Sequence, residues 1–259
     1  MTTQSQSSGI KSAVEQRFSP VAANYSTSAV HAQGADLAVM VDMARLTGDE
    51  RVLDAGCGAG HTALAFAPHV RHVTALDLSL PMLGQVEKLA VERGLTNITT
   101  RQGDVEQIPF PDASFDLIVS RYSAHHWPRP QDALAEFHRL LRPGGRLLLD
   151  DVVGFDAPAL DTFLQTIELL RDPSHVRDHS PAQWLAMLAA AGFAGEVAHT
   201  WDIFLDFESW HTRIATPDLH VAMLRALFAG AAPEVRAALK VHENNDFTIP
   251  GALFVAARA

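Results

Sequence analysis

The sequence predicts an α/β fold in which a mostly parallel sheet has helices on both faces. Short apolar runs of strand length alternate with amphipathic stretches of helix length along most of the chain. The first two such runs each end near a carboxylate, Asp54 and Asp77, and the turn after the first contains three glycines. Because right-handed crossovers bring the ends of parallel strands to one edge of a sheet, we expect a ligand site at that edge.

The composition favours a protein that acts on small molecules. The chain has 259 residues, a formal net charge of −10 and no basic cluster, which argues against nucleic acid as the main partner. No apolar run approaches the roughly 18 residues needed to cross a membrane. The polar start lacks the apolar core of an export signal, so we expect a cytoplasmic protein. The oligomeric state stays open.

Cysteine and histidine usage predicts neither a disulfide nor a metal site. The single cysteine, Cys57, cannot form an internal disulfide, and nothing near it in the sequence would activate it as a nucleophile. The histidines show no spacing typical of zinc ligands. We therefore expect no bound metal.

The segment before the first strand is expected to pack against the sheet as a lid. Residues 1–12 are polar and predict a disordered tail, whereas apolar residues at three- and four-residue steps predict helices within 13–46. Such a segment must pack near the carboxyl end of the first strand or along its flank. Tyr25 in this lid is either a residue that covers the cofactor or a partly exposed core aromatic.

The glycine turn is the clearest functional signal. Strand 51–55 is separated from the next helix by Gly56, Gly58 and Gly60. Glycine tolerates positive φ and lets a ligand approach the backbone, so this turn suits a small-molecule site. The dinucleotide fingerprint G-x-G-x-x-G would place its last glycine at His61, one residue later than the third glycine found.

Two further acids follow strand ends. Asp77 lies one βαβ unit after Asp54, so both are expected at the same edge of the sheet, where a carboxylate can accept the hydroxyl protons of a ribose. Gly103, Asp104 and Val105 follow the third strand. There the carboxylate can accept the amine of an adenine while the valine covers its face.

The other elements continue the alternation. Strands are expected at 51–55, 72–76, 98–102, 115–120, 146–153, 193–210 and 247–258. Helices are expected at 61–67, 81–93, 131–142, 160–170 and 181–191, and one or two more within 217–240.

The loop after the fourth strand and the region after the fifth are candidates for the acceptor end of the site. His125 and His126 emerge where ligands bind in open α/β sheets, so either can act as a base or simply shape the pocket. Asp151 in the fifth strand is a further candidate. The helical insertion 157–180 should cover the same edge, and its loop contains His175, Arg177 and His179, which the sequence places as either acceptor ligands or solvated side chains.

Four motifs occur in a recognisable order and spacing. They are VLDAGCGAG, ALDLSLPML, GDVEQIPFPDASFDLIVS and LRPGGRLLL, and together they span roughly residues 45–153. In this stretch the chain resembles the class I methyltransferases that use S-adenosyl-L-methionine (SAM), and within them the group of the ubiquinone and menaquinone C-methyltransferases. The resemblance implies a Rossmann-like, seven-stranded sheet with an antiparallel last strand.

The resemblance also implies which residues hold SAM. Gly56 and Gly58 would face its methionine portion, with Asp54 behind them. The other implied binding residues are Asp77 at the ribose, Leu78 and Met82 beside the adenine, Gly103, Asp104 and Val105 at the adenine edge and face, and Ser120 and Arg121 near the methionine portion.

The resulting hypothesis is a methyltransferase that moves a methyl group from SAM to the O, N or C atom of a small molecule by in-line displacement. Its SAM-binding core is expected at 47–156, and residues 181–259 complete the sheet and its helices. A nucleotide-dependent oxidoreductase is one alternative, against which His61 counts because of its place in the glycine turn. A SAM-binding module without catalysis is the other.

Overall fold

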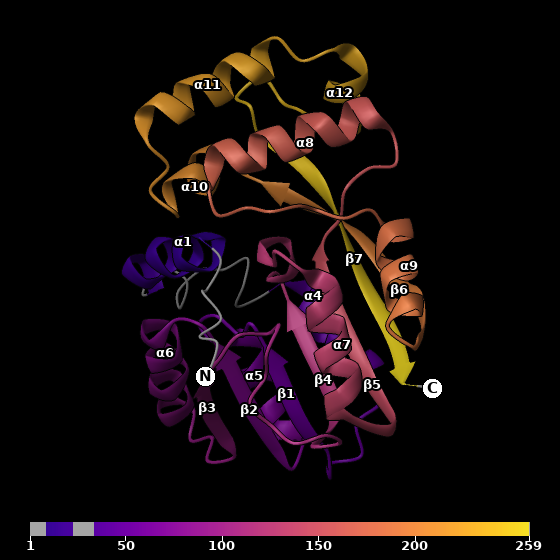
Figure 1. Ribbon diagram of the computed structural model, residues 1–259. Helices are drawn as coiled ribbons and strands as arrows, with labels where there is room; N and C mark the ends of the chain where they lie inside the picture. Colours follow the sequence, from indigo (N-terminus) through magenta and orange to yellow (C-terminus); the bar gives the residue numbers. More distant parts are fainter. Residues whose placement is uncertain (1–8, 23–33, 259) are drawn as a thin grey trace, which may run out of the picture.

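A seven-stranded sheet forms the centre of the protein in the computed structural model, which describes residues 9–22 and 34–258 (Figure 1). The strands are β1 (Arg51–Ala55), β2 (His72–Asp77), β3 (Ile98–Gln102), β4 (Phe115–Arg121), β5 (Leu141–Val152), β6 (Phe193–Leu205) and β7 (Phe247–Arg258). Their order is β3-β2-β1-β4-β5-β7-β6. The first five strands are parallel, and β7 runs antiparallel to both β5 and β6. The predicted fold class is therefore confirmed.

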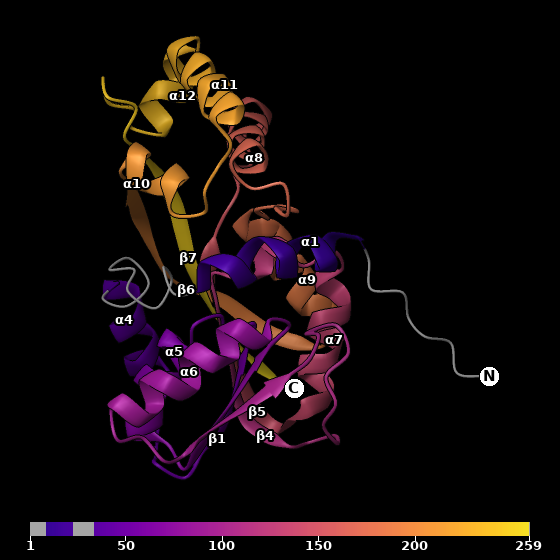
Figure 2. The same ribbon diagram turned by 90° about the vertical axis from the view of Figure 1, so that its left-hand side faces the viewer.

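Helices cover both faces of the sheet because the strands are apolar on both sides. On one face lie α4 (Ala35–Met43), α5 (His61–Phe66) and α6 (Leu80–Glu92), and on the other lie α7 (Pro130–Leu140) and α9 (Pro181–Ala190) (Figure 2). Neighbouring residues of one strand pack into different cores, as Val52 does with the first group and Leu53 with the second.

A helical cap lies over the carboxyl edge of the parallel strands (Figure 1). It consists of α8 (Pro158–Arg171), α10 (Phe207–Thr212), α11 (Asp218–Ala229) and α12 (Pro233–Ala238). These helices share a third core with the ends of β6 and β7, in which Phe207, Trp210 and Phe228 are almost fully buried. The expected insertion at 157–180 thus supplies only α8, and a later part of the chain completes the cap.

Helix α1 (Gly9–Phe18) and the 3₁₀ turn η1 (Ser19–Val21) lie between the cap and the sheet (Figure 2). α1 begins four residues before the expected start of the lid, so residues 9–12 are helical and not part of a polar tail. Tyr25 lies outside the described residues.

The two largest differences from the predicted strand bounds have local reasons. β6 ends at Leu205 because Asp206 caps α10, accepting a hydrogen bond from Ser209 N at 2.8 Å. β5 begins at Leu141, and the register irregularity opposite Phe115 lets the Pro-Gly-Gly segment join the strand. The stretch 217–240, where one or two helices were expected, contains the two helices α11 and α12.

Candidate active site

The glycine turn after β1 forms the floor of a cavity. Gly56, Gly58 and Gly60 all have positive φ, at 71°, 51° and 85°. A Cβ on Gly56 would lie 2.0 Å from Ser123 Oγ, and one on Gly60 would lie 2.6 Å from a methyl group of Val86. A Cβ on Gly58 would meet nothing within 4 Å, so this backbone faces open space. The turn thus packs tightly against Ser123 and Val86 and leaves room for a ligand beside Gly58.

Asp77 at the end of β2 holds the turn in place. Its Oδ2 accepts a hydrogen bond from Gly58 N and its Oδ1 one from Ser79 N, each at 2.8 Å. Burial raises the pKa of Asp77, and the same two hydrogen bonds act in the opposite direction. A carboxylate has about four lone-pair sites, so it can accept further hydrogen bonds from a ligand.

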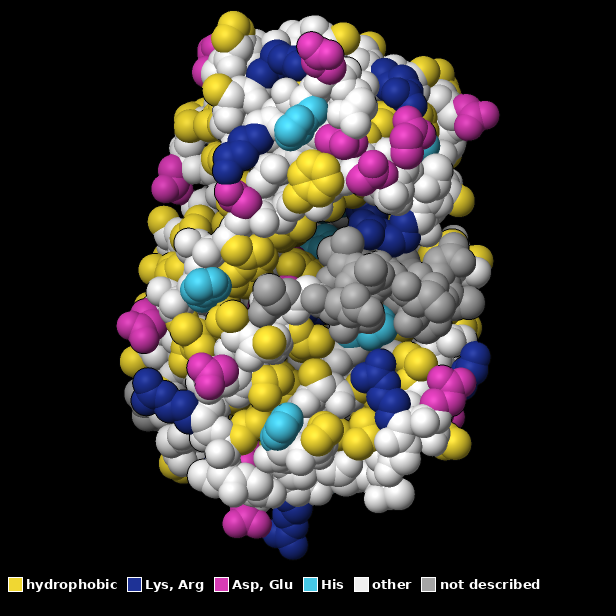
Figure 3. All heavy atoms as spheres, turned by 180° about the vertical axis from the view of Figure 1, so that it is seen from behind, with side chains coloured by type: hydrophobic (Ala, Val, Ile, Leu, Met, Phe, Trp, Pro, Cys, Tyr) yellow, Lys and Arg dark blue, Asp and Glu magenta, His cyan; other side chains and the backbone are white. Residues whose placement is uncertain are grey.

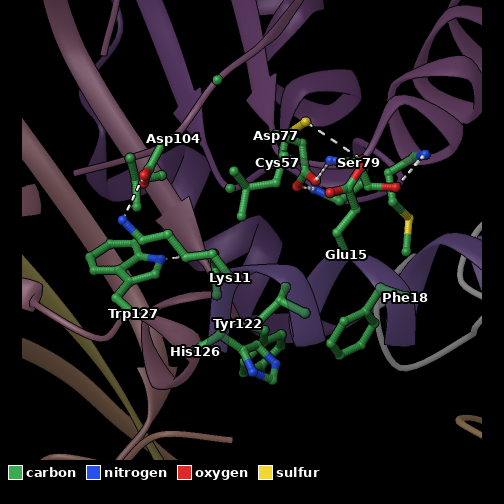
Figure 4. A pocket seen from close by; sticks show the side chains of 18 of the residues that line it. Lys11, Glu15, Phe18, Cys57, Asp77, Ser79, Asp104, Tyr122, His126 and Trp127 are labelled. Atoms are coloured by element: carbon green, nitrogen blue, oxygen red, sulfur yellow. Dashed lines mark hydrogen bonds and ion pairs between the residues drawn. The ribbon is translucent and has the colours of Figure 1, made fainter. Parts of the chain in front are cut away.

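The cavity above the turn, hereafter the glycine-loop cavity, together with the open solvent at its mouth has about 1040 Å³ free of protein atoms. Nine of the residues predicted to bind the cofactor line it: Gly56, Gly58, Asp77, Leu78, Met82, Gly103, Asp104, Val105 and Arg121. Figure 4 labels two of them, Asp77 and Asp104. Its wall therefore combines acids for hydroxyl and amine groups with an apolar slot that suits a purine ring.

Two of the predicted residues do not line this cavity. Asp54 lies behind the turn, as expected, where its Oδ2 accepts a hydrogen bond from Ala63 N at 2.8 Å, and burial raises its pKa to about 7. Ser120 was expected near the cofactor, but its side chain is buried and its Oγ donates to the carbonyl of Ala55 at 2.7 Å. Ser120 thus ties β4 to β1 and does not reach the cavity.

Helix α1 contributes residues that the sequence did not single out. Lys11, Glu15 and Phe18 are on the side of α1 that faces the cavity (Figure 4). Lys11 Nζ lies 2.6 Å from Asp104 Oδ2 and also pairs with Glu106. Because 93 residues separate Lys11 from Asp104, no local sequence signal marks this contact. Ser123 and Trp127 were also missed, although they belong to the loop that the sequence had singled out after β4.

Arg121 joins three elements at the edge of the sheet. Its guanidinium lies 2.5 Å from Asp36 Oδ2 in α4 and 3.6 Å from Asp150 Oδ2 in β5, and all three side chains are buried. Burial and the charge of Asp36 raise the pKa of Asp150 well above its usual value. The raised pKa favours the protonated form of the Asp150 carboxyl group, and Asp36 is the carboxylate that lies closer to the guanidinium.

A second cavity, hereafter the cap cavity, lies between the sheet edge and the helical cap. It encloses about 640 Å³ free of protein atoms. Phe18, Tyr122 and His126 line both cavities, so the two adjoin. Its remaining wall consists of polar residues, His125, Glu168, Arg171, Asp178 and Arg213, and of apolar ones, Val152, Ile203, Leu205, Trp210 and Ile249.

The two neighbouring histidines have opposite environments. His125 Nδ1 lies 2.7 Å from Asp151 Oδ1, whereas His126 Nδ1 faces the carbonyl of Ser174 at 3.1 Å. Burial alone would lower the pKa of His125, but the charge and hydrogen bond of Asp151 outweigh it and raise this pKa to about 9. Burial and the charge of His125 lower the pKa of His126 to about 4. At neutral pH the first histidine is charged and the second is neutral.

The candidate side chains of the insertion loop mainly hold the loop together. His175 Nε2 lies 3.0 Å from Gln165 Oε1, and Arg177 pairs with Asp161 at 2.6 Å. His179 Nδ1 lies 3.3 Å from a glutamine of α9. None of these three side chains lines the cap cavity. The neighbouring Asp178 lines it, although the sequence did not single this residue out.

The described residues place no metal centre near these cavities. In residues 9–22 and 34–258, no three or more His, Cys, Asp or Glu side chains are arranged to hold a metal ion. No helix in the same ranges is long and apolar enough to cross a membrane.

Comparison with known proteins places these features in a family. A model of the methyltransferase domain matches residues 53–149. The uncharacterized methyltransferase YcgJ of Bacillus subtilis is 41% identical over 203 residues, which cover 78% of this chain and 80% of YcgJ. The crystal structure of YcgJ superposes with a TM-score of 0.83 over 86% of this chain and 97% of that one, at 35% identity.

Two more distant proteins extend the comparison. The ubiquinone/menaquinone C-methyltransferase UbiE of Methylobacterium nodulans is 37% identical over 43% of this chain and 45% of its own length. The geranyl diphosphate C-methyltransferase of Streptomyces coelicolor, crystallised with S-adenosyl-L-homocysteine, shares the fold at 18% identity. Its TM-score is 0.61, with 88% of this chain and 79% of that one covered.

Proposed function

Because the chain belongs to the class I methyltransferases and uses SAM, we propose that it transfers a methyl group to a small organic molecule bound in the cap cavity. The observation that supports this most directly is the shared wall of the two cavities. Phe18, Tyr122 and His126 line both, so a methyl donor in the glycine-loop cavity and an acceptor in the cap cavity would meet at this boundary.

The residues of the glycine-loop cavity fit SAM. The bare backbone at Gly58 leaves space that any side chain would fill. Asp77 would accept the ribose hydroxyls, Leu78 and Met82 would flank the adenine, and Asp104 would accept its amine. Bound SAM supplies an electrophilic methyl group on a positively charged sulfur.

The contribution of the protein to such a reaction is alignment and exclusion of water. Methyl transfer to an aligned nucleophile is an in-line displacement, and holding two reactants in the productive geometry can by itself supply much of the acceleration. Helix α1 lies over the glycine-loop cavity, and the cap covers the adjoining one. We assign the lid role to α1 on this basis.

The walls of the cap cavity and the distribution of charge on the protein surface both support a small acceptor. The cap cavity is walled by buried apolar side chains such as Trp210 and Ile249, which suit a compact ligand. On the face in Figure 3, Lys and Arg side chains are scattered among acidic and apolar ones and do not form a patch that would bind a nucleic acid.

The size class of the acceptor can be tested by following the label. The protein is incubated with SAM carrying a tritiated methyl group and with a cell extract divided by dialysis into small and large molecules. After chromatography has separated unreacted SAM, we expect label in a new small molecule from the dialysable fraction, and no such product with the Asp77→Ala variant. Label that enters only the retained protein or RNA would contradict a small acceptor. Isothermal titration with SAM establishes separately that the wild-type protein binds the cofactor.

A further inference from the structure

We propose that the cap cavity binds its acceptor as an organic oxyanion, the ionised form of an acidic enol or phenol, and that His125 and Asp178 hold the charged oxygen. The proposal rests on the proposed function, since it names the substrate class of the same site. It assigns both residues to binding and positioning the acceptor, in place of the base that the sequence suggested for the histidine.

The ring of His125 lines the cap cavity and is held in place by Asp151. Its Nδ1 donates to Asp151, whose carboxylate is itself held by hydrogen bonds from Ala124 N at 2.6 Å and Val152 N at 2.8 Å. The ring lines the cap cavity, and with Nδ1 engaged, Nε2 is the nitrogen that can bind a ligand. Since the buried charge of Asp151 keeps the ring protonated at neutral pH, Nε2 is a hydrogen-bond donor.

Asp178 presents a second polar group to the same cavity. The residue is 2% exposed, and among the residues that the structure describes its Oδ2 has no hydrogen-bond partner, although His175 Nε2 lies 3.8 Å from it. Gln165 fixes the backbone on both sides of it, accepting from Asp178 N at 3.1 Å and donating to its carbonyl at 2.8 Å. Burial and the charge of Glu168 raise the pKa of Asp178 well above its usual value. A protonated carboxyl group at this position is a donor that lacks an acceptor.

The groups around His125 and Asp178 favour binding of an anionic ligand. The titratable and charged groups that face this pair come from every neighbouring element: Asp151, Asp161, His126, Glu168, Arg171, Asp172, His175 and Arg213. Arg171 pairs with Glu168 at 3.7 Å, and burial raises the pKa of Glu168. An ammonium group entering this cavity would meet the cationic side chains of His125, Arg171 and Arg213. An oxyanion would meet two hydrogen-bond donors, His125 Nε2 and the carboxyl group of Asp178, without displacing any hydrogen bond.

The same groups include no effective base, which excludes a neutral alcohol as the acceptor because it would have to be deprotonated in the site. His125 already holds its proton, and the low pKa of His126 makes that ring a weak base. An acidic enol or phenol needs neither, because it loses its proton to solvent before methyl transfer. The apolar walls then hold the body of the acceptor away from water, where the interaction with a charged histidine is strong.

Binding of 4-nitrophenol to the protein saturated with S-adenosyl-L-homocysteine tests the proposal. This phenol is half ionised near neutral pH, and only its anion absorbs strongly in the violet. At that pH we expect the anion band to increase as protein is added. His125→Gln should weaken binding by about tenfold and abolish the increase, since it removes one charge-assisted hydrogen bond.

Further variants separate a binding role from a purely structural one. Asp178→Ala should weaken binding of 4-nitrophenol by about tenfold, whereas Asp178→Asn keeps a donor and should weaken it by less than about threefold. His199→Gln is the matched control, because His199 is exposed on β6 and lines neither cavity. Its binding of 4-nitrophenol should equal that of the wild type.

Three results would overturn the proposal: an anion band that stays constant or decreases, binding of the neutral 4-nitroanisole as tight as that of 4-nitrophenol, or unchanged behaviour of His125→Gln. Calorimetric titration of each protein with S-adenosyl-L-homocysteine is performed alongside. Absence of that binding in the wild type would contradict the proposed function itself. Normal binding together with any of the three results would contradict only the choice of acceptor.

Discussion

Replacing Asp77 by asparagine should weaken cofactor binding more than it destabilises the fold. The carboxylate accepts hydrogen bonds from Gly58 N and Ser79 N, both at 2.8 Å, and we assign its remaining lone pairs to the two ribose hydroxyls. Asparagine turns one of the two oxygens into an NH₂ group that cannot accept. One ribose hydroxyl therefore loses its acceptor.

The size of the effect follows from the charge of the lost acceptor. A hydrogen bond to a charged group contributes about 1.5–3 kcal/mol, and about 1.4 kcal/mol corresponds to a tenfold change in Kd. We therefore expect the Kd for S-adenosyl-L-homocysteine to rise by about 10- to 150-fold. The loss of folding stability should be smaller, about 1 kcal/mol, because burial already raises the pKa of Asp77 and removal of the charge offsets part of the lost hydrogen bond.

Isothermal titration calorimetry measures the Kd, and urea denaturation measures the stability of each variant. Glu92→Gln is the matched control, since it removes one negative charge from α6 at an exposed side chain outside the cavity. Its Kd should equal that of the wild type. A folded Asp77→Asn protein whose Kd lies within twofold of the wild type would refute the assignment of Asp77 to the ribose.

Three further changes test the packing and charges around the cavities. Gly154→Ala would place a Cβ 2.4 Å from the carbonyl oxygen of Asp178. We expect the free energy of unfolding, measured by urea denaturation, to fall by about 1–3 kcal/mol, and binding of 4-nitrophenol to weaken. Unchanged stability and binding would show that the loop around Asp178 can move to make room for the methyl group. Arg121→Met should cost about 3–5 kcal/mol because it leaves buried carboxyl groups without their cation, whereas Arg142→Met, at a half-exposed surface pair, should cost less than about 1 kcal/mol in the same assay. Because the pKa of His125 is raised from 6.5 to about 9, its ion pair stabilises the fold fully below about pH 6.5 and ceases to do so as the pH rises through about 9. The difference in Tm between wild type and His125→Gln should therefore shrink over that range, and a constant difference would contradict the raised pKa.

The strands and the glycine turn were predictable because they depend on local chemistry. β1, β3 and β7 have the predicted bounds, since turn-forming residues stand directly before each of these runs. The positive φ of Gly58 and the place of Asp77 at a strand end follow from residue type and from the handedness of βαβ units. The hydrogen bond of Ser120 could not be predicted, because the direction of a side chain at a strand end depends on the neighbouring strand, whose carbonyl it binds.

The sequence by itself determined the fold class and the cofactor-binding edge of this protein, because strand periodicity, glycine spacing and acids at strand ends are properties of short segments. It could not distinguish His125 from His126, which are adjacent and chemically identical. Only the tertiary structure decided that Asp151, 26 residues later, pairs with the first of them, and that Asp178 lines the same cavity. It likewise placed Lys11 against Asp104 across 93 residues. Such contacts are set by the packing of the cap and of α1 on the sheet, and the charge states of buried groups depend on those neighbours.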